Sequence, residues 1–182
     1  MTFDHYTLRP IRMEDAKAFF TLVSANREYI RDYLPVTAAG IQDIPATEAY
    51  IEEKIILADE KEHYCLLIED RHTHTLAGAF FLKNLDWKVP KCELGYFVNH
   101  AHGGKGLMSD AMARVVQFCF GVLGMNKIYL RTGIHNTASR RVAEKNGFEV
   151  EGILRRDFRI HDGSLVDLAY YGLVNPTLIE PT

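Results

Sequence analysis

The stretch YFVNHAHGGKGLMSDAM, residues 96–112, joins a strand-like apolar segment to a helical pattern through a loop with three glycines and two histidines. Glycine lets the backbone approach a ligand closely, and the first N–H groups of a helix have no partner inside that helix. A glycine-rich turn from strand to helix is therefore typical of anion-binding sites. The stretch predicts an α/β protein that holds an anionic ligand at this turn.

Strand and helix patterns flank the loop on both sides. Before it, the sequence predicts an irregular segment over residues 31–45, helices over residues 13–30 and 47–62, and strands over residues 5–11, 63–69, 76–85 and 92–98. After it, helices are predicted over residues 105–122 and 138–146, and strands over residues 127–132, 148–158 and 165–174. The short links between the strands from residue 63 to residue 98 indicate an antiparallel meander. We expect one α/β domain over residues 1–182 with a mixed sheet.

The composition excludes several classes of partner. The 182 residues are 47% hydrophobic and carry a formal net charge of −3, so the surplus of Lys and Arg expected of a general nucleic-acid binder is absent. No apolar run approaches the roughly 20 residues that span a bilayer, and MTFDHYTLRP lacks the apolar core of a secretion signal. Cys65, Cys92 and Cys119 lie in apolar runs, as buried free thiols do. We expect a soluble cytoplasmic protein, monomeric or homodimeric.

The loop departs from two common phosphate-binding motifs. A P-loop needs Gly-x-x-x-x-Gly-Lys-Ser/Thr, but Asn99 stands at the first glycine position and Gly106 follows Lys105. A dinucleotide fingerprint needs an acidic residue about 20 positions on, and residues 111–143 contain no Asp or Glu. The same interval contains an excess of positive charge: Arg114, Lys127, Arg131, Arg140 and Arg141. These residues suit a ligand with several phosphates; the alternative is a tight turn beside solvated cations.

Two motifs resemble the GNAT superfamily of N-acetyltransferases. VNHAHGGKGLMSDA, residues 98–111, resembles the acetyl-CoA loop, and HNTASRRVAEKNGFEVEG, residues 135–152, resembles the second signature of the family. NREYIRDYLP and CELGYFV are similar to the gate segment and the central strand of the subgroup that acetylates N-termini of ribosomal proteins. One departure is Ala101, where the family often has Gln or Arg. The resemblance implies a mostly antiparallel, splayed sheet of about seven strands with about four helices.

The resemblance also implies a cofactor site without metal. Acetyl-CoA would be the co-substrate, with its pyrophosphate on the backbone of the glycine loop and its pantetheine along the strand before it. The expected cofactor-binding residues are Phe97, Val98, His102, Gly103, Gly104, Lys105, Gly106, Leu107, Met108, Asn136 and Ser139. His72 and His74 lie in a polar turn without a third ligand nearby in sequence, so we expect no metal site there.

Acetyl transfer to an amine needs a neutral amine and a proton donor for the departing thiolate. Glu93 is our candidate base, acting through water, and its alternative role is an ordinary strand carboxylate paired with a basic neighbour. If Glu93 is not the base, water or another carboxylate such as Glu149 or Glu151 would take the proton. The resemblance implies that Ser139 hydrogen-bonds the sulfur; simple helix capping is the alternative for Ser139 and Asn136.

The acceptor amine is less determined by the sequence. Tyr33, Leu34 and Trp87 fall in segments with which the family walls its acceptor cleft, and packing alone is the alternative. The resemblance favours transfer to the N-terminal α-amine of a protein. Transfer to a small-molecule amine, such as a polyamine, an amino acid or a drug, would use the same cofactor features, and so would a CoA-binding sensor without catalysis.

Overall fold

One eight-stranded sheet organises the molecule. The computed structural model describes residues 1–178, so the last four residues of the expected domain lie outside the described residues. The strands are β1 (Thr2–Phe3), β2 (Tyr6–Pro10), β3 (Tyr64–Asp70), β4 (Leu76–Asp86), β5 (Lys91–Val98), β6 (Lys127–Gly133), β7 (Glu149–Arg159) and β8 (Leu165–Val174). Their order in the sheet is β1-β2-β3-β4-β5-β6-β8-β7. The predicted mixed, mostly antiparallel α/β sheet is confirmed.

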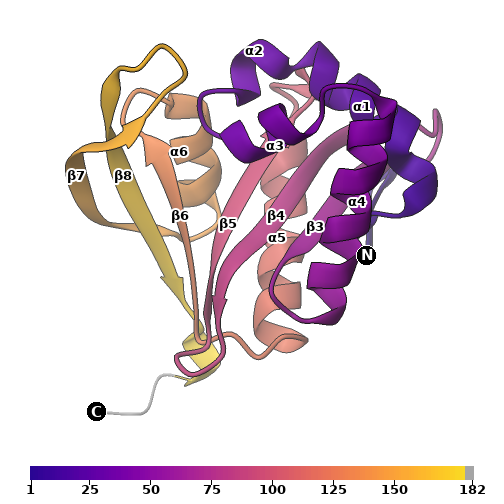
Figure 1. Ribbon diagram of the computed structural model, residues 1–182. Coiled ribbons are helices and arrows are strands. Elements are labelled where there is room, and N and C mark those ends of the chain that lie inside the picture. Colours follow the sequence, from indigo (N-terminus) through magenta and orange to yellow (C-terminus); the bar gives the residue numbers. More distant parts are fainter. Residues whose placement is uncertain (179–182) are drawn as a thin grey trace.

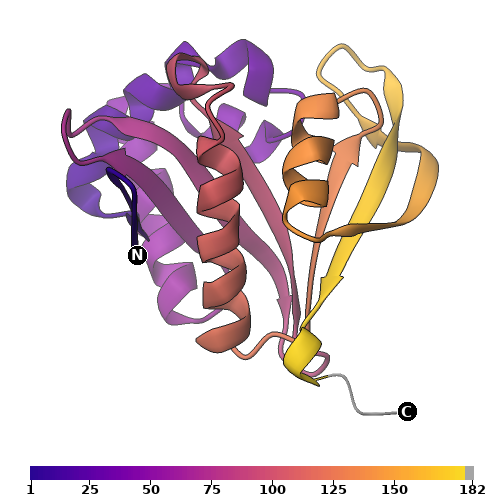
Figure 2. The ribbon, with the colours of Figure 1, turned by 180° about the vertical axis from the view of Figure 1, so that it is seen from behind.

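Helices cover both faces of this sheet. α1 (Ala16–Ala25) and α4 (Ile44–Asp59) lie on one face, with the short α2 (Arg27–Ile30) and α3 (Pro35–Gly40) beside them (Figure 1). α5 (Leu107–Gly121) and α6 (Thr137–Lys145) lie on the other face (Figure 2). Three 3₁₀ turns complete the described chain: Met13–Asp15, His100–His102 and Pro176–Leu178. No helix of this part of the chain is both long and apolar enough to cross a membrane.

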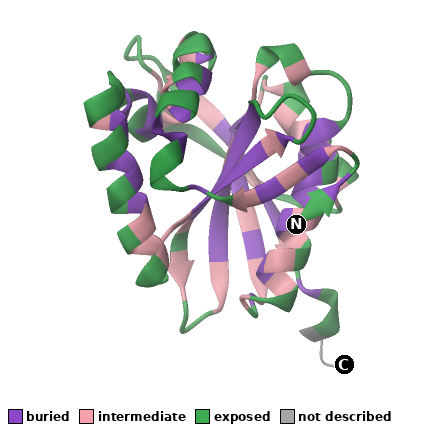
Figure 3. Cartoon of the chain, turned by 90° about the vertical axis from the view of Figure 1, so that its right-hand side faces the viewer, coloured by how far each residue is buried: buried purple, intermediate pink, exposed green. Residues whose placement is uncertain are grey.

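The central strands are buried on both faces, as the purple segments of Figure 3 show. Along β3, Cys65 and Leu67 face the core under α1 and α4, whereas Leu66 and Ile68 face the core under α5. The alternation follows from the two-residue repeat of a strand, and helices on both faces explain the continuous apolar runs. The two cores hold the middle of the sheet rigidly, so the ends of its strands can carry a site.

The sheet opens between β5 and β6, its parallel pair. Lys91 to Leu94 pair in register with Lys127 to Leu130, and in the described chain no further pair joins these two strands. Beyond that point β5 continues to Val98 along β4, while β6 continues along β8, so the two halves diverge toward the glycine loop (Figure 1). The splayed sheet that the resemblance implied is confirmed.

Several expected boundaries are wrong. The helix predicted over residues 13–30 breaks at Asn26, whose side chain donates to the Leu22 carbonyl and competes with the helical backbone. The predicted irregular segment contains α3, which starts at Pro35, a residue well suited to a first helical turn. α4 begins three residues earlier than predicted because Asp43 caps it, accepting the Ala46 N–H at 2.8 Å. With the extra strand β1, these differences give six α-helices and eight strands in the described chain.

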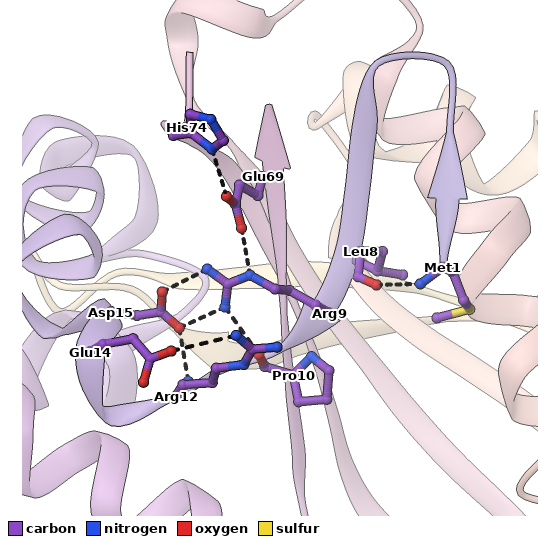
Figure 4. Close-up of polar contacts among 9 residues, drawn as sticks. All are labelled: Met1, Leu8, Arg9, Pro10, Arg12, Glu14, Asp15, Glu69 and His74. Carbon is purple, nitrogen blue, oxygen red and sulfur yellow. Dashed lines mark hydrogen bonds and ion pairs between the residues drawn. The ribbon is translucent and has the colours of Figure 1, made fainter. Parts of the chain in front are cut away.

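An ion-pair network ties β2 to its neighbours (Figure 4). The Arg9 guanidinium donates to both oxygens of the buried Asp15 carboxylate at 2.7 Å and to Glu69 on β3. Asp15 also accepts the Arg12 N–H at 2.8 Å, which fixes the turn before α1. The bidentate pair connects the first helix to the sheet away from the glycine loop, so we assign this network a structural role.

Candidate active site

A cavity of about 410 Å³ occupies the opening between β5 and β6. Its walls come from the glycine loop and the start of α5, from β5, from the first turns of α6, and from α2 with the turn after it. Residues expected to bind cofactor or acceptor that line it are Tyr33, Leu34, Phe97, Val98, His102, Gly103, Gly104, Gly106, Leu107, Met108, Asn136 and Ser139. The candidate catalytic residue Glu93 lines it as well.

The glycine loop presents unpaired backbone donors to this cavity. Gly104 and Gly106 have φ angles of 77° and 83°, which favour glycine, and an added Cβ at either would meet open space. Gly106 precedes α5 as its N-cap, so the helix starts at Leu107 and not at residue 105 as predicted. No acceptor in the described chain contacts the backbone N–H groups of residues 104–108. Five successive free donors at a helix N-terminus fit a pyrophosphate.

The loop is held from two sides. His102 Nδ1 lies 3.1 Å from the Tyr6 hydroxyl on β2. The His100 N–H donates to Oδ1 of the buried Asn26 at 3.1 Å, at the junction of α1 and α2. These contacts hold the loop without using the N–H groups of residues 104–108, which stay available to a ligand. The histidines thus support the loop, and among residues 1–178 no three His, Cys, Asp or Glu side chains form a group that could hold a metal ion.

Two of the five expected cations reach the cavity. Arg131 and Arg141 line it, together with Lys145, which the sequence did not indicate. Arg114 instead contacts Gln117 on the exposed side of α5, Lys127 pairs with Glu151, and Arg140 donates to Tyr171. The side chain of Lys105 is exposed and does not line the cavity, although its N–H belongs to the free run. The excess of positive charge in residues 111–143 therefore predicts only some of the cations that line the cavity.

Asn136 caps α6, Ser139 lies in the first turn of that helix, and both line the cavity. The Asn136 Oδ1 accepts the Ser139 N–H at 3.1 Å, as a helix cap does. The Ser139 Oγ lies 2.8 Å from the hydroxyl of Tyr96 on β5, a residue that the sequence did not indicate as functional. Burial raises the pKa of Tyr96 above its usual range, so its hydroxyl stays protonated and can donate. The same hydroxyl also donates to the Ser139 carbonyl oxygen at 3.1 Å, so Tyr96 and Ser139 form one hydrogen-bonded group that lines the cavity.

Glu93 is 3% exposed, accepts three hydrogen bonds from Arg131 and Asn84, and forms an ion pair with Lys83. Arg131 Nε and Nη2 contact its two oxygens at 3.0 and 3.1 Å, Lys83 Nζ lies 3.2 Å from one, and Asn84 Nδ2 donates to the other at 2.7 Å. A carboxylate offers about four lone-pair positions; three accept hydrogen bonds here, and the Lys83 ammonium lies beside one of the two oxygens. The structure therefore favours the ion-paired alternative over the role of a base.

Tyr33 and Leu34 form a wall against two glycines of the sheet. A Cβ at Gly95 on β5 would lie 3.2 Å from Leu34 Cδ2, and one at Gly133 on β6 would lie 3.0 Å from the Tyr33 hydroxyl. The wall thus bridges the two diverging strands, with Tyr29 and Ile30 of α2 completing it. This arrangement encloses the end of the cavity away from α5.

Trp87 was assigned wrongly to that wall. It lies in the turn between β4 and β5, at the end of β5 opposite to the glycine loop, and its Nε1 donates to the Lys61 carbonyl at 2.9 Å. It does not line the cavity. The alternative bases Glu149 and Glu151 do not line it either, because β7 is an edge strand and Glu151 pairs with Lys127 at 2.6 Å.

Comparisons with known proteins agree with this geometry. Residues 5–149 match the family model described as an acetyltransferase (GNAT) domain. The N-acetyltransferase YoaA of Bacillus subtilis is 31% identical over 176 residues, which cover 95% of each chain. A spermidine N(1)-acetyltransferase of Vibrio cholerae is 29% identical over 126 residues, 62% of this chain and 70% of that protein. The solved structure of a ribosomal L7/L12 α-N-protein acetyltransferase in complex with coenzyme A has a TM-score of 0.88 at 19% identity and covers 96% of both chains.

Proposed function

The chain belongs to the GNAT family of acetyltransferases, and we propose that it transfers the acetyl group of acetyl-CoA directly to the N-terminal α-amine of a protein. One observation carries the proposal: a cavity joins five free N–H groups, a Tyr–Ser donor pair and a separate walled end. These three parts match what a phosphorylated acyl donor, its leaving thiolate and an acceptor amine need. One similar solved structure is named as an acetyltransferase of the α-amine of ribosomal protein L7/L12, which supports a ribosomal protein as the acceptor here.

The residues of the cavity fit acetyl-CoA. The free N–H groups of residues 104–108, together with Arg141 and Lys145, would hold the phosphates, and the unpaired edge of β5 from Gly95 to Val98 would hold the pantetheine. Bound there, acetyl-CoA supplies an acyl group activated as a thioester. The Tyr96 hydroxyl, which lies 2.8 Å from Ser139 Oγ and 3.1 Å from the Ser139 carbonyl oxygen, would donate a hydrogen bond to Oγ, so that the Ser139 hydroxyl can donate a hydrogen bond to the departing sulfur. The transfer forms one C–N bond and breaks one C–S bond, and the amine proton leaves to water.

An α-amine suits this site better than a side-chain amine. At pH 7 an α-amine with a pKa near 8 is roughly a tenth neutral, whereas lysine is neutral about once in 2,500 molecules. Among the residues that line the cavity in the described chain, Glu93 is the one acidic residue, and its carboxylate is ion-paired with Arg131 and Lys83 and accepts three hydrogen bonds. A site without an available carboxylate base favours the amine that needs it least.

A small-molecule amine is the second candidate, since a spermidine acetyltransferase is among the relatives. A non-catalytic CoA sensor is the third. The test is to incubate the protein with acetyl-CoA and either an N-terminal peptide, free lysine or spermidine, and to follow acetylation by mass spectrometry. We expect the peptide to be modified on its α-amine. Faster acetylation of spermidine would support the second candidate, and binding of acetyl-CoA without any transfer would support the third.

Binding is measured separately by thermal shift. Acetyl-CoA at 100 times its dissociation constant should stabilise the fold by about 2.7 kcal/mol, because it binds the native state and not the unfolded chain. NADH at the same concentration is the control and should give no shift. A shift with NADH and none with acetyl-CoA would contradict the assignment of the cavity.

A further inference from the structure

We infer that Lys83 and Arg131 form an anion-binding subsite at the acceptor end of the cavity, and that the preferred acceptor carries carboxylates close to its amine. The inference rests on the proposed function and names its substrate class: a protein N-terminus followed by acidic residues. The argument starts from where these two cations lie.

Lys83 comes from β4 and Arg131 from β6, on either side of β5. Both line the cavity, and their side chains are 33% and 29% exposed, whereas the side chain of Glu93 between them is 4% exposed. Lys83 also lies near the wall, because a Cβ at Gly95 would be 3.8 Å from Lys83 Cε and 3.2 Å from Leu34. The two cations are thus accessible at the walled end of the cavity, while their shared counter-ion is buried.

Both cations keep donors for a ligand. Lys83 Nζ forms an ion pair with Glu93 at 3.2 Å, and Arg131 uses two donors on Glu93 and one on the Tyr170 hydroxyl at 3.4 Å. Within residues 1–178, the other two N–H groups of Arg131 have no acceptor, and Lys83 Nζ has no hydrogen-bond acceptor besides its ion pair with Glu93. These N–H groups point to a ligand with carboxylate oxygens, for which a guanidinium and an ammonium are the usual partners.

The net charge of this end is positive. Glu93 neutralises one of the two cations, and no other acidic residue of the described chain lines the cavity. Asp157 approaches the group through Tyr170, which donates to it at 2.9 Å, but Asp157 does not line the cavity. Arg141 and Lys145 on α6 add positive charge at the cofactor end. A partly enclosed site of one sign attracts anions and repels a polyamine.

The test compares three peptides that share an N-terminal serine and differ in the next residues: Ser-Asp-Asp, Ser-Ala-Ala and Ser-Lys-Lys. We expect kcat/KM for the acidic peptide to exceed that for the basic one by about tenfold or more, and the ratio to fall at high salt. Lys83→Gln should lower this ratio by at least about threefold, Lys83→Arg should keep it, and Lys88→Gln, an exposed lysine outside the cavity, should leave it unchanged.

The outcomes separate the two proposals. Acetylation of Ser-Ala-Ala with no acidic preference, or with a preference for Ser-Lys-Lys or spermidine, overturns the inference and leaves the proposed function intact. An unchanged ratio in Lys83→Gln also overturns it. If no peptide is acetylated, the proposed function fails, and calorimetric titration of the three peptides into the CoA-loaded protein decides the inference: tighter binding of the acidic peptide supports it, and equal or weaker binding refutes it.

Discussion

Replacing Glu93 by glutamine separates its two roles in one variant. The substitution keeps the shape of the side chain but removes its charge and turns one acceptor oxygen into a donor amide. Arg131 Nε or Lys83 can still reach the remaining oxygen. The new amide would face Arg131 Nη2 and Asn84 Nδ2, which are donors themselves. We therefore expect Glu93→Gln to destabilise the fold.

The size of this effect follows from the hydrogen bonds and ion pairs that the Glu93 carboxylate makes. Two hydrogen bonds to a charged acceptor disappear, and two cations lose the counter-ion that they share in a mostly buried position. Leaving a buried charge without its partner costs about 3–5 kcal/mol, but Lys83 and Arg131 keep access to water, so we expect about 3 kcal/mol. For a chain of this length that corresponds to a Tm lower by roughly 6–12 °C.

Calorimetry and a pH profile test the two roles together. If Glu93 is an anchor, kcat/KM for a Ser-Ala-Ala peptide should fall in Glu93→Gln by the same factor at every pH from 6.5 to 9. If Glu93 is the base, activity should recover as rising pH supplies neutral amine. An unchanged Tm together with such a recovery would refute the anchor. Lys88→Gln serves as the control for removal of a charge outside the cavity.

Three further predictions concern the glycine loop, the donor pair and acid stability. Gly106→Ala should lose about 1–2 kcal/mol of stability and at least about tenfold in acetyl-CoA affinity. The control Gly124→Ala, at a similar φ of 66° but outside the cavity, should lose only stability. Equal acetyl-CoA affinities of the two variants, measured by calorimetry, would contradict this prediction. Ser139→Ala and Tyr96→Phe should each weaken acetyl-CoA binding about fivefold, or ~1 kcal/mol, and the double variant no further, because Tyr96 acts on the sulfur only through the Ser139 hydroxyl. Additive losses would show independent roles. Burial and, to a lesser extent, the nearby Lys54 and Lys83 lower the pKa of His63 to about 4. Below about pH 6.5 the unfolded chain therefore binds a proton on this histidine, whereas the native state does not. The free energy of unfolding should fall by up to about 3 kcal/mol between pH 6.5 and 4. His63→Phe should remove that loss in urea titrations, and an unchanged dependence on pH would contradict the cause.

Local patterns predicted the sheet and the loop. Continuous apolar runs gave β3, β4 and β5 within one residue at each end, because strands buried on both faces leave little room for polar residues. The glycine spacing located the turn before α5, since only a backbone at positive φ needs glycine there. Boundaries failed where a side chain intervened, as at Asn26 and Asp43, because a single polar side chain can break or start a helix without altering the apolar pattern.

Pairings across the fold could not be predicted. Tyr96 and Ser139 are 43 residues apart, and Arg131 and Glu93 are 38 apart, so the register of the sheet and the packing of α6 decide whether they meet. Trp87 was misplaced because it is close in sequence to β5. It lies in the turn before β5, whereas the cavity is at the other end of that strand. The donors around Glu93 therefore had to come from the structure.

The free N–H groups of residues 104–108 belong to the main chain, and every residue type except proline carries such a group. The donors of the loop therefore depend on the torsion angles of Gly104 and Gly106 and on open space above the backbone, and not on a side-chain functional group. The wall of Tyr29, Ile30, Tyr33 and Leu34 is built from side chains, so a substitution there changes the surface that an acceptor meets. The acceptor preference can thus be altered by substitutions in this wall while the acyl-donor half of the site stays intact.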